Sequence, residues 1–192
     1  MKIATKLNVA LRPACLAIAA FALALGPLAL GLPALGQEST QSQSLPQVHL
    51  NADGLAPRPI EELTGTTIAR YYALAWHEMA GALESGRTSA LSDEFIGVAK
   101  ERLTRRVNEQ RQTGIHVRIV DHGHNLKAVF YSTDGAAMQL FDQAQLEIQT
   151  FDGDKLLDTQ TVPHQYMILM TPGADRWYIR DLEEVEVSAK SF

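Results

Sequence analysis

A long stretch of alternating polarity, from Gly135 to Asp154, constrains the fold of this chain more than any other feature. Its even positions from 136 to 148 are apolar except for Asp142, whereas four of its odd positions are glutamine and one is glutamate. A period of two predicts a β-strand with one buried face and one solvated face. About 15 residues in a strand span about 50 Å, roughly three times the usual strand length, so a compact domain needs a bent sheet to hold them.

The N-terminal residues 1–36 have the layout of a secretory signal. Basic residues precede a long apolar run without acidic residues, and Ala34-Leu35-Gly36 fits a small-x-small cleavage site. We therefore expect export to the periplasm or the cell exterior, with the mature chain starting near Gln37. The alternative is an uncleaved membrane anchor formed by residues 14–36, although Gly26 and Pro27 interrupt a continuous helix there.

Without residues 1–36, the remaining 156 residues suit one domain, and the formal charge falls from −5 to −8. A negative chain without a basic cluster argues against nucleic acid as a partner. The single cysteine, Cys15, lies in the expected signal, so no disulfide or thiol chemistry is expected in the mature protein. Residues 37–58 are rich in Ser, Gln, Pro and Gly and predict a flexible linker or an extended arm.

The rest of the chain predicts helices followed by strands. Apolar residues three or four apart predict a helix over 59–84 and a second helical region over 91–113, capped by Ser92 or Asp93. From Ile115 the period becomes two. We expect strands at 115–119, 126–132, 136–150, 156–170 and 176–187, joined by tight turns, with the first turn at His122-Gly123-His124-Asn125. Short connections make neighbouring strands antiparallel, which gives an α+β meander.

This element order, closing with the strand Asp175-Arg176-Trp177-Tyr178-Ile179-Arg180, resembles the nuclear transport factor 2-like (NTF2-like) superfamily. The resemblance covers residues 59–187, leaving 188–192 as a tail, and implies helices packed in the concave face of a strongly bent antiparallel sheet. The superfamily includes ketosteroid isomerases, polyketide cyclases and many noncatalytic binding or dimerising domains. The resemblance therefore implies a fold and leaves the activity open.

Asp142 is the sharpest candidate for chemistry, because its strand neighbours Leu140 and Ala144 are apolar. Burial generally raises the pKa of a carboxyl group, which suits a general acid or a hydrogen-bond donor. The alternative is a bulge near residues 141–143 that turns Asp142 to solvent. His164, which follows Pro163 in a strand, is a second candidate base, or else a satisfied core histidine.

We call the space between the expected bent sheet and its helices the cone. The aromatic residues Tyr72, Trp76, Tyr166 and Trp177 are candidate ligand contacts in the cone, or simply core residues. Asp121-His122-Gly123-His124 offers three potential metal ligands in four residues, but the predicted hairpin tip explains its polarity, so no metal site is expected. We also expect no cofactor, since phosphate-loop and dinucleotide fingerprints are missing from the sequence.

Two hypotheses follow. The first is an exported noncatalytic module that binds a small apolar molecule in its cone or a protein partner on its sheet. A homodimer could also form through the sheet, because the uncharged glutamines of 139–149 suit a hydrated interface. The second is a small acid/base enzyme of the isomerase or cyclase kind that uses Asp142. We favour the first hypothesis. An acid/base enzyme usually needs two ionisable groups that converge on the substrate, and the sequence places only Asp142 firmly inside the cone.

Overall fold

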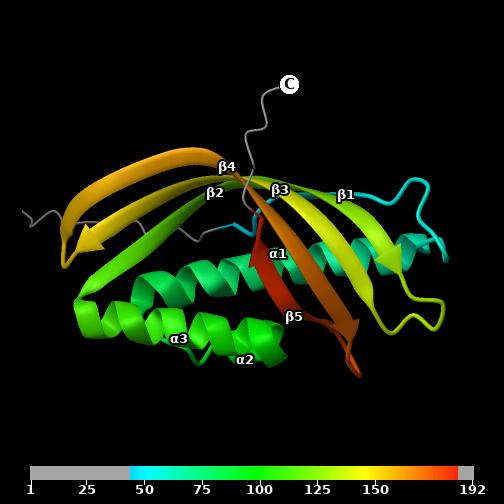
Figure 1. Ribbon diagram of the computed structural model, residues 1–192, viewed down its shortest axis with the longest axis horizontal. Helices are drawn as coiled ribbons and strands as arrows, with labels where there is room; N and C mark the ends of the chain where they lie inside the picture. The colour runs from blue at the N-terminus through cyan, green and yellow to red at the C-terminus, as the bar shows by residue number, and fades with distance from the viewer. Residues whose placement is uncertain (1–43, 186–192) are drawn as a thin grey trace, which may run out of the picture. The chain divides into compact units, whose positions relative to one another are not determined.

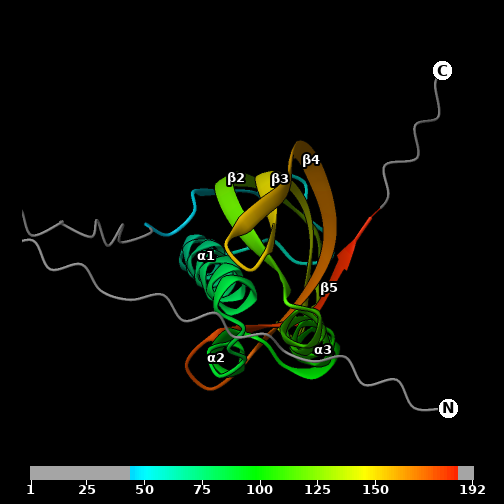
Figure 2. The ribbon, with the colours of Figure 1, turned by 90° about the vertical axis from the view of Figure 1, so that its left-hand side faces the viewer.

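The computed structural model describes residues 44–185, in which a five-stranded sheet bends over three helices (Figure 1). The strands are β1 (Val48–Asn51), β2 (Ile115–Tyr131), β3 (Met138–Asp152), β4 (Lys155–Pro172) and β5 (Trp177–Glu184), in that order across the sheet. The pairs β2–β3, β3–β4 and β4–β5 are antiparallel, as expected for a meander. The end-on view shows α1 and α3 on the same side of the curved sheet (Figure 2). The predicted α+β class, with helices in the concave face of a bent meander, is confirmed.

Strand β3 lies at the centre of the sheet, between β2 and β4. The side chains at even positions from Met138 to Leu146 are buried, including Asp142, whereas Gln143 and Gln145 are exposed. The alternation of the sequence therefore correctly predicted which face of this strand points to the core. Turns at Gly135 and Gly153 bound the strand, and both glycines have positive φ angles of 76° and 55°.

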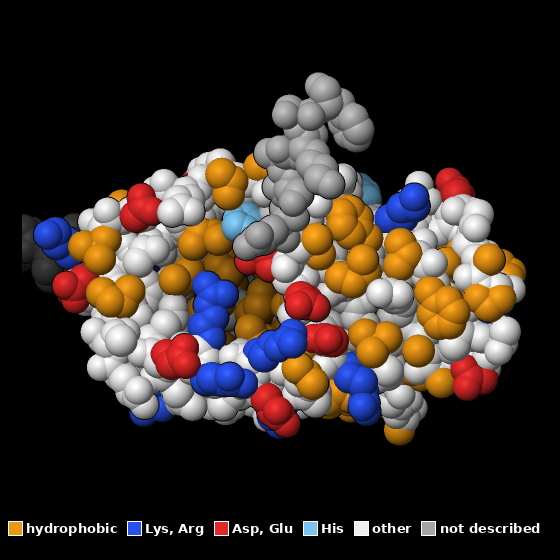
Figure 3. Space-filling model, viewed as in Figure 1, with side chains coloured by type: hydrophobic (Ala, Val, Ile, Leu, Met, Phe, Trp, Pro, Cys, Tyr) orange, Lys and Arg blue, Asp and Glu red, His pale blue; other side chains and the backbone are white. Residues whose placement is uncertain are grey.

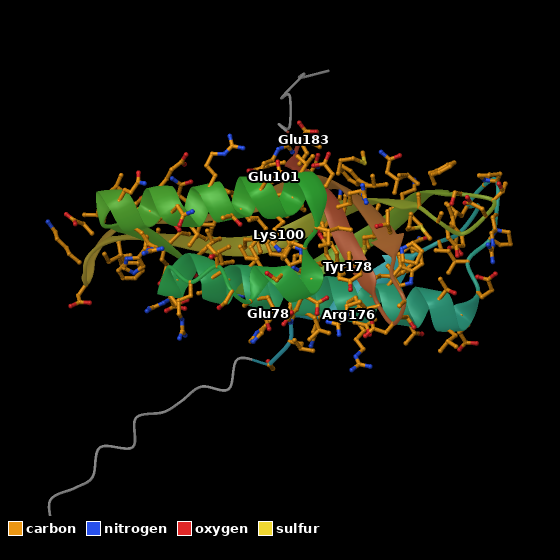
Figure 4. The ribbon with its side chains drawn as sticks, turned by 90° about the horizontal axis from the view of Figure 1, so that it is seen from below. Glu78, Lys100, Glu101, Arg176, Tyr178 and Glu183 are labelled. Atoms are coloured by element: carbon orange, nitrogen blue, oxygen red, sulfur yellow. The ribbon has the colours of Figure 1, made fainter. Side chains whose placement is uncertain are left out.

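Helix α1 (Glu62–Ser85) packs one face against this sheet. Its buried residues follow a three-or-four spacing, and they are Ile68, Tyr72, Ala73, Ala75, Trp76, Met79, Ala82 and Leu83. Gly86 ends the helix in the left-handed conformation and donates its N–H to Ala82 O at 2.9 Å. Seen from below, α1 and α3 lie side by side, with Glu78 on α1 and Lys100 and Glu101 on α3 (Figure 4).

The second helical region differs from the expectation of one helix over 91–113. It forms α2 (Leu91–Glu94) and α3 (Gly97–Thr113), separated by an extended Phe95 and Ile96. The break is stabilised by tertiary pairing, because Phe95 bridges Ile179 of β5 and Ile96 N donates to Ile179 O at 3.0 Å. The predicted cap was also wrong, since neither α2 nor α3 begins with a side-chain capping bond.

The predicted hairpin at His122–Asn125 is wrong, because β2 is one continuous strand through these residues. Its register against β3 shifts between Asp121 and Gly123 and again between Ala128 and Phe130. Each β-bulge inserts one residue, so the buried positions change from odd (Val117, Ile119) to even (His124, Leu126, Ala128). In the sequence, a switch of the apolar residues from odd to even positions interrupts the alternation, and such an interruption resembles a turn between two strands.

Of the two alternatives for residues 37–58, a flexible linker or an extended arm, the C-terminal part fits the extended arm. Val48–Asn51 forms β1, which pairs parallel with residues 124–127 of β2. Val48 and Leu50 are half-buried and pack against the core, so these two apolar side chains give the short strand its inner face. The closing strand ends at Glu184, three residues earlier than expected at the C-terminal side.

The expected signal over 1–36 and the tail over 188–192 lie outside the described residues. Within 44–185, no helix is both long enough and apolar enough to cross a membrane.

Candidate functional site

Asp142 lies at the centre of the candidate site and is completely buried. It pairs in register with Leu126 of β2 and Tyr166 of β4 without a bulge, so the alternative that turned Asp142 to solvent is wrong. Its Oδ2 accepts a hydrogen bond from the Tyr72 hydroxyl at 2.8 Å and a second from His124 Nδ1 at 2.6 Å. Because side chains alternate along β3, the Asp142 carboxylate lies on the concave face of the sheet. There Tyr72 of α1 and His124 of β2 donate hydrogen bonds to it.

His124 joins Asp142 to a second carboxylate. Its Nε2 lies 2.8 Å from Asp121 Oδ2, and Asp121 Oδ1 accepts the Gly123 N–H at 2.8 Å. Burial by itself would lower the pKa of His124, but hydrogen bonds and charges of Asp121 and Asp142 outweigh it and raise this pKa to about 9. His124 is therefore an imidazolium at neutral pH, and both its ring N–H groups donate. We call Tyr72, Asp142, His124 and Asp121 the buried polar chain.

The bulge at Asp121–Gly123 is what brings His124 into the core. Gly123 has a φ of 123°, and its neighbour His122 points to solvent. His124 N also donates to Gln47 O, next to β1, at 2.9 Å, which holds the bulged segment against the sheet edge. His124 was not among the site residues predicted from the sequence. The available signal was the switch from odd to even apolar positions across His122-Gly123, where glycine permits the unusual backbone.

Three aromatic side chains pack around the buried polar chain. The Trp76 ring centroid lies 4.5 Å from that of His124 and 5.2 Å from that of Tyr166, and the Tyr72 ring lies edge-on to both His124 and Trp76. Burial raises the pKa of Tyr72 well above its usual value, and the Asp142 charge adds to the rise. Burial also raises the pKa of Tyr166. Both phenols therefore stay protonated at neutral pH.

Several buried polar atoms of this region lack a hydrogen-bond partner among the described residues. They are Asp142 Oδ1, Trp76 Nε1 and His164 Nε2. An unpaired buried polar atom typically costs about 1–3 kcal/mol, so folded proteins contain few of them. Their occurrence on three neighbouring elements, α1, β3 and β4, indicates a place where a bound molecule or water completes the hydrogen bonding.

His164 and Tyr166 connect the buried polar chain to the surface. His164 Nδ1 lies 2.6 Å from Glu184 Oε1, and its ring stacks on Tyr166 with centroids 6.2 Å apart. Tyr166 is half-buried and lies between His164 and Trp76. Trp177 is not part of this group, because it packs against Tyr131, with ring centroids 6.4 Å apart.

The face of the molecule between β4 and α3, beside β5, is hollowed (Figure 3). Apolar side chains form the bottom of the hollow, and Lys, Arg, Asp and Glu side chains surround its lower edge. Among these elements, Arg102 of α3 pairs with Asp181 of β5 at 3.0 Å. Within residues 44–185, no group of three or more His, Cys, Asp and Glu side chains is arranged to hold a metal ion.

The intermembrane space region of the chloroplast protein ARC6 is similar in structure, with a TM-score of 0.58 over 67% of this chain and 98% of that one, at 15% identity. Helices followed by a bent, mostly antiparallel meander are the architecture expected for this fold. The chain has the NTF2-like fold.

Weaker similarities, each with a TM-score of 0.44, are found to two Streptomyces proteins. One, from Streptomyces avermitilis, is described as a candidate dehydratase of the NTF2-like family, with 12% identity over 65% of this chain and 99% of that one. The other is Aln2 from a second Streptomyces species, with 14% identity over 67% of this chain and 93% of that one. No protein-family model and no curated protein matches the sequence.

Proposed function

We propose that this NTF2-like chain is a noncatalytic binding module whose cone takes up a small molecule with an apolar body. The observation that carries the proposal is the pairing of aromatic walls with unpartnered polar atoms. Asp142 Oδ1 supplies a buried acceptor, and the buried indole N–H of Trp76 lies close to the Tyr72 hydroxyl. Ligand sites commonly combine apolar surfaces with a few convergent polar groups in this way.

The surroundings of Asp142 favour binding over proton transfer. A general base or acid needs a partner of matched pKa that can exchange a proton with the substrate. Both His124 nitrogens are engaged by carboxylates, and a pKa of about 9 keeps the ring protonated at neutral pH. Tyr72 already donates to Asp142, and its raised pKa keeps that proton on the phenol.

One observation favours a second candidate, the acid/base enzyme. Asp142 Oδ1 is free to accept a proton from a bound substrate. The two functions differ in the effect of Asp142→Asn. For an enzyme, this substitution stops turnover while substrate still binds, whereas for a binding module it changes affinity itself.

The indole N–H signals of the two tryptophans provide the test. Phenethylamine, 2-phenylethanol and 3-phenylpropanoate are added in turn to ¹⁵N-labelled protein, with Trp177→Phe used to assign the signals. Binding in the cone predicts that at least one probe shifts the Trp76 signal in a saturable way. The Trp177 signal serves as the internal control, because Trp177 packs against Tyr131 and not against Tyr166. Absence of any Trp76 shift, or equal shifts of both signals, would refute the proposal.

A further inference from the structure

The free oxygen of Asp142 indicates the chemical class of the ligand, an inference that rests on the proposed binding function. Asp142 is fully buried, and its Oδ2 already accepts two hydrogen bonds. Its Oδ1 has no partner among the described residues. A carboxylate oxygen only accepts hydrogen bonds, so the ligand group that meets it must be a donor.

The charges of the buried polar chain favour a cationic donor over a neutral one. The His124 ring is the one basic group of the buried polar chain, and it is shared by two carboxyl groups, Asp121 and Asp142. Tyr72 stays protonated and adds no charge, so the acidic groups of the chain outnumber its basic group. Because buried charges are costly unless they are paired, a ligand cation beside Asp142 Oδ1 would complete the pairing.

The aromatic rings near Asp142 also favour a positively charged ligand. Trp76 lies against both Tyr72 and Tyr166, with ring centroids 6.3 Å and 5.2 Å away. Ring faces attract ammonium groups, most strongly where water is excluded, and Trp is the best of the aromatic side chains in this respect. The positive charge of Arg106 lies near Tyr166 and would repel a ligand cation, but Arg106 is exposed on α3, so solvent screens its charge.

We propose that the cone binds a protonated amine attached to an apolar, ring-sized body, with the ammonium group donating to Asp142 Oδ1. The apolar body lies among Tyr72, Trp76 and Tyr166. His164 and Glu184 lie on the exposed side of Tyr166.

The test compares three probes of nearly equal size: phenethylamine, 2-phenylethanol and 3-phenylpropanoate. Dissociation constants come from the Trp76 indole signal in wild type, in Asp142→Asn, and in Asp158→Asn, which removes an exposed carboxylate of β4 as a matched control. We expect the amine to bind on the order of tenfold more tightly than the alcohol, as a charged hydrogen bond allows, and the carboxylate to bind most weakly. Asp142→Asn should abolish the preference for the amine, and Asp158→Asn should retain it.

Failure of this inference is distinct from failure of the proposed function. If the alcohol or the carboxylate shifts Trp76 with an affinity equal to that of the amine, the cone still binds ligands but the amine assignment is wrong. If no probe shifts Trp76, the binding function itself fails. If Asp142→Asn does not fold, the ¹³C signal of the Asp142 carboxyl group in the wild-type protein tests the amine assignment instead. A direct contact predicts that phenethylamine shifts this signal more than 2-phenylethanol does, and equal shifts would contradict the contact.

Discussion

The charge on His124 makes the stability of the protein depend on pH. The His124 side chain is fully buried, and its pKa in the folded protein is about 9, against 6.5 as the ordinary value. Because the folded pKa is raised, the imidazolium stabilises the fold fully below pH 6.5, and this stabilisation is lost as the pH rises through 9. A difference of about 2.5 pKa units at 1.36 kcal/mol each corresponds to about 3 kcal/mol of unfolding free energy.

The assay is urea unfolding between pH 6.5 and pH 9.5. All measurements are made in a Glu94→Gln background, that is, in protein that already carries this substitution. Burial raises the pKa of Glu94 to about 7, so Glu94 itself makes the protein less stable as the pH rises from 4.5 to 7, and this loss would overlap with that from His124. We expect a fall of about 3 kcal/mol in this background and the same fall in a His49→Gln control, since His49 is exposed. A His124→Gln variant should lose this fall. If it does not fold, NMR titration of the His124 ring decides, and a pKa near or below 6.5 would refute the imidazolium.

Three further predictions concern packing, backbone and processing. Trp76→Ala should lower the unfolding free energy by about 3–5 kcal/mol, and a loss below about 1 kcal/mol in urea would contradict its burial against the sheet. Gly123→Ala should cost about 1–3 kcal/mol because of its φ of 123°. Gly81→Ala, at an exposed position in the last turns of α1, should instead stabilise by about 0.5–1 kcal/mol; equal thermal melts would contradict the bulge. N-terminal sequencing of exported protein should begin near Gln37, and an intact Met1 in a soluble cytoplasmic fraction would contradict export.

Local patterns predicted the fold where each element keeps a single period. Trp76 and Tyr72 share the inner face of α1 because their spacing is helical, and Asp142 points inward because β3 alternates without interruption from Met138 to Leu146. The prediction failed where tertiary contacts decide the backbone. Pairing of Ile96 with Ile179 of β5 divides the second helical region, which its apolar spacing alone cannot reveal.

The candidate site was predicted only in part for the same reason. Asp142, Tyr72, Trp76 and Tyr166 were candidates in the sequence, and the structure brings these four together. His124 was assigned to a turn, because a bulge shifts the phase of β2 without any local mark except Gly123. The partnership between His124 and Asp121 depends on that bulge, so neither spacing nor residue type indicated it.

The most direct test of the account is a crystal structure of the protein with phenethylamine. We expect the amine nitrogen within hydrogen-bond distance of Asp142 Oδ1, about 3 Å, with the phenyl ring against Trp76 and Tyr166. Phenethylamine found on the outer face of the sheet, or a saturated crystal in which the region between Asp142 and Trp76 holds no ligand, would contradict it.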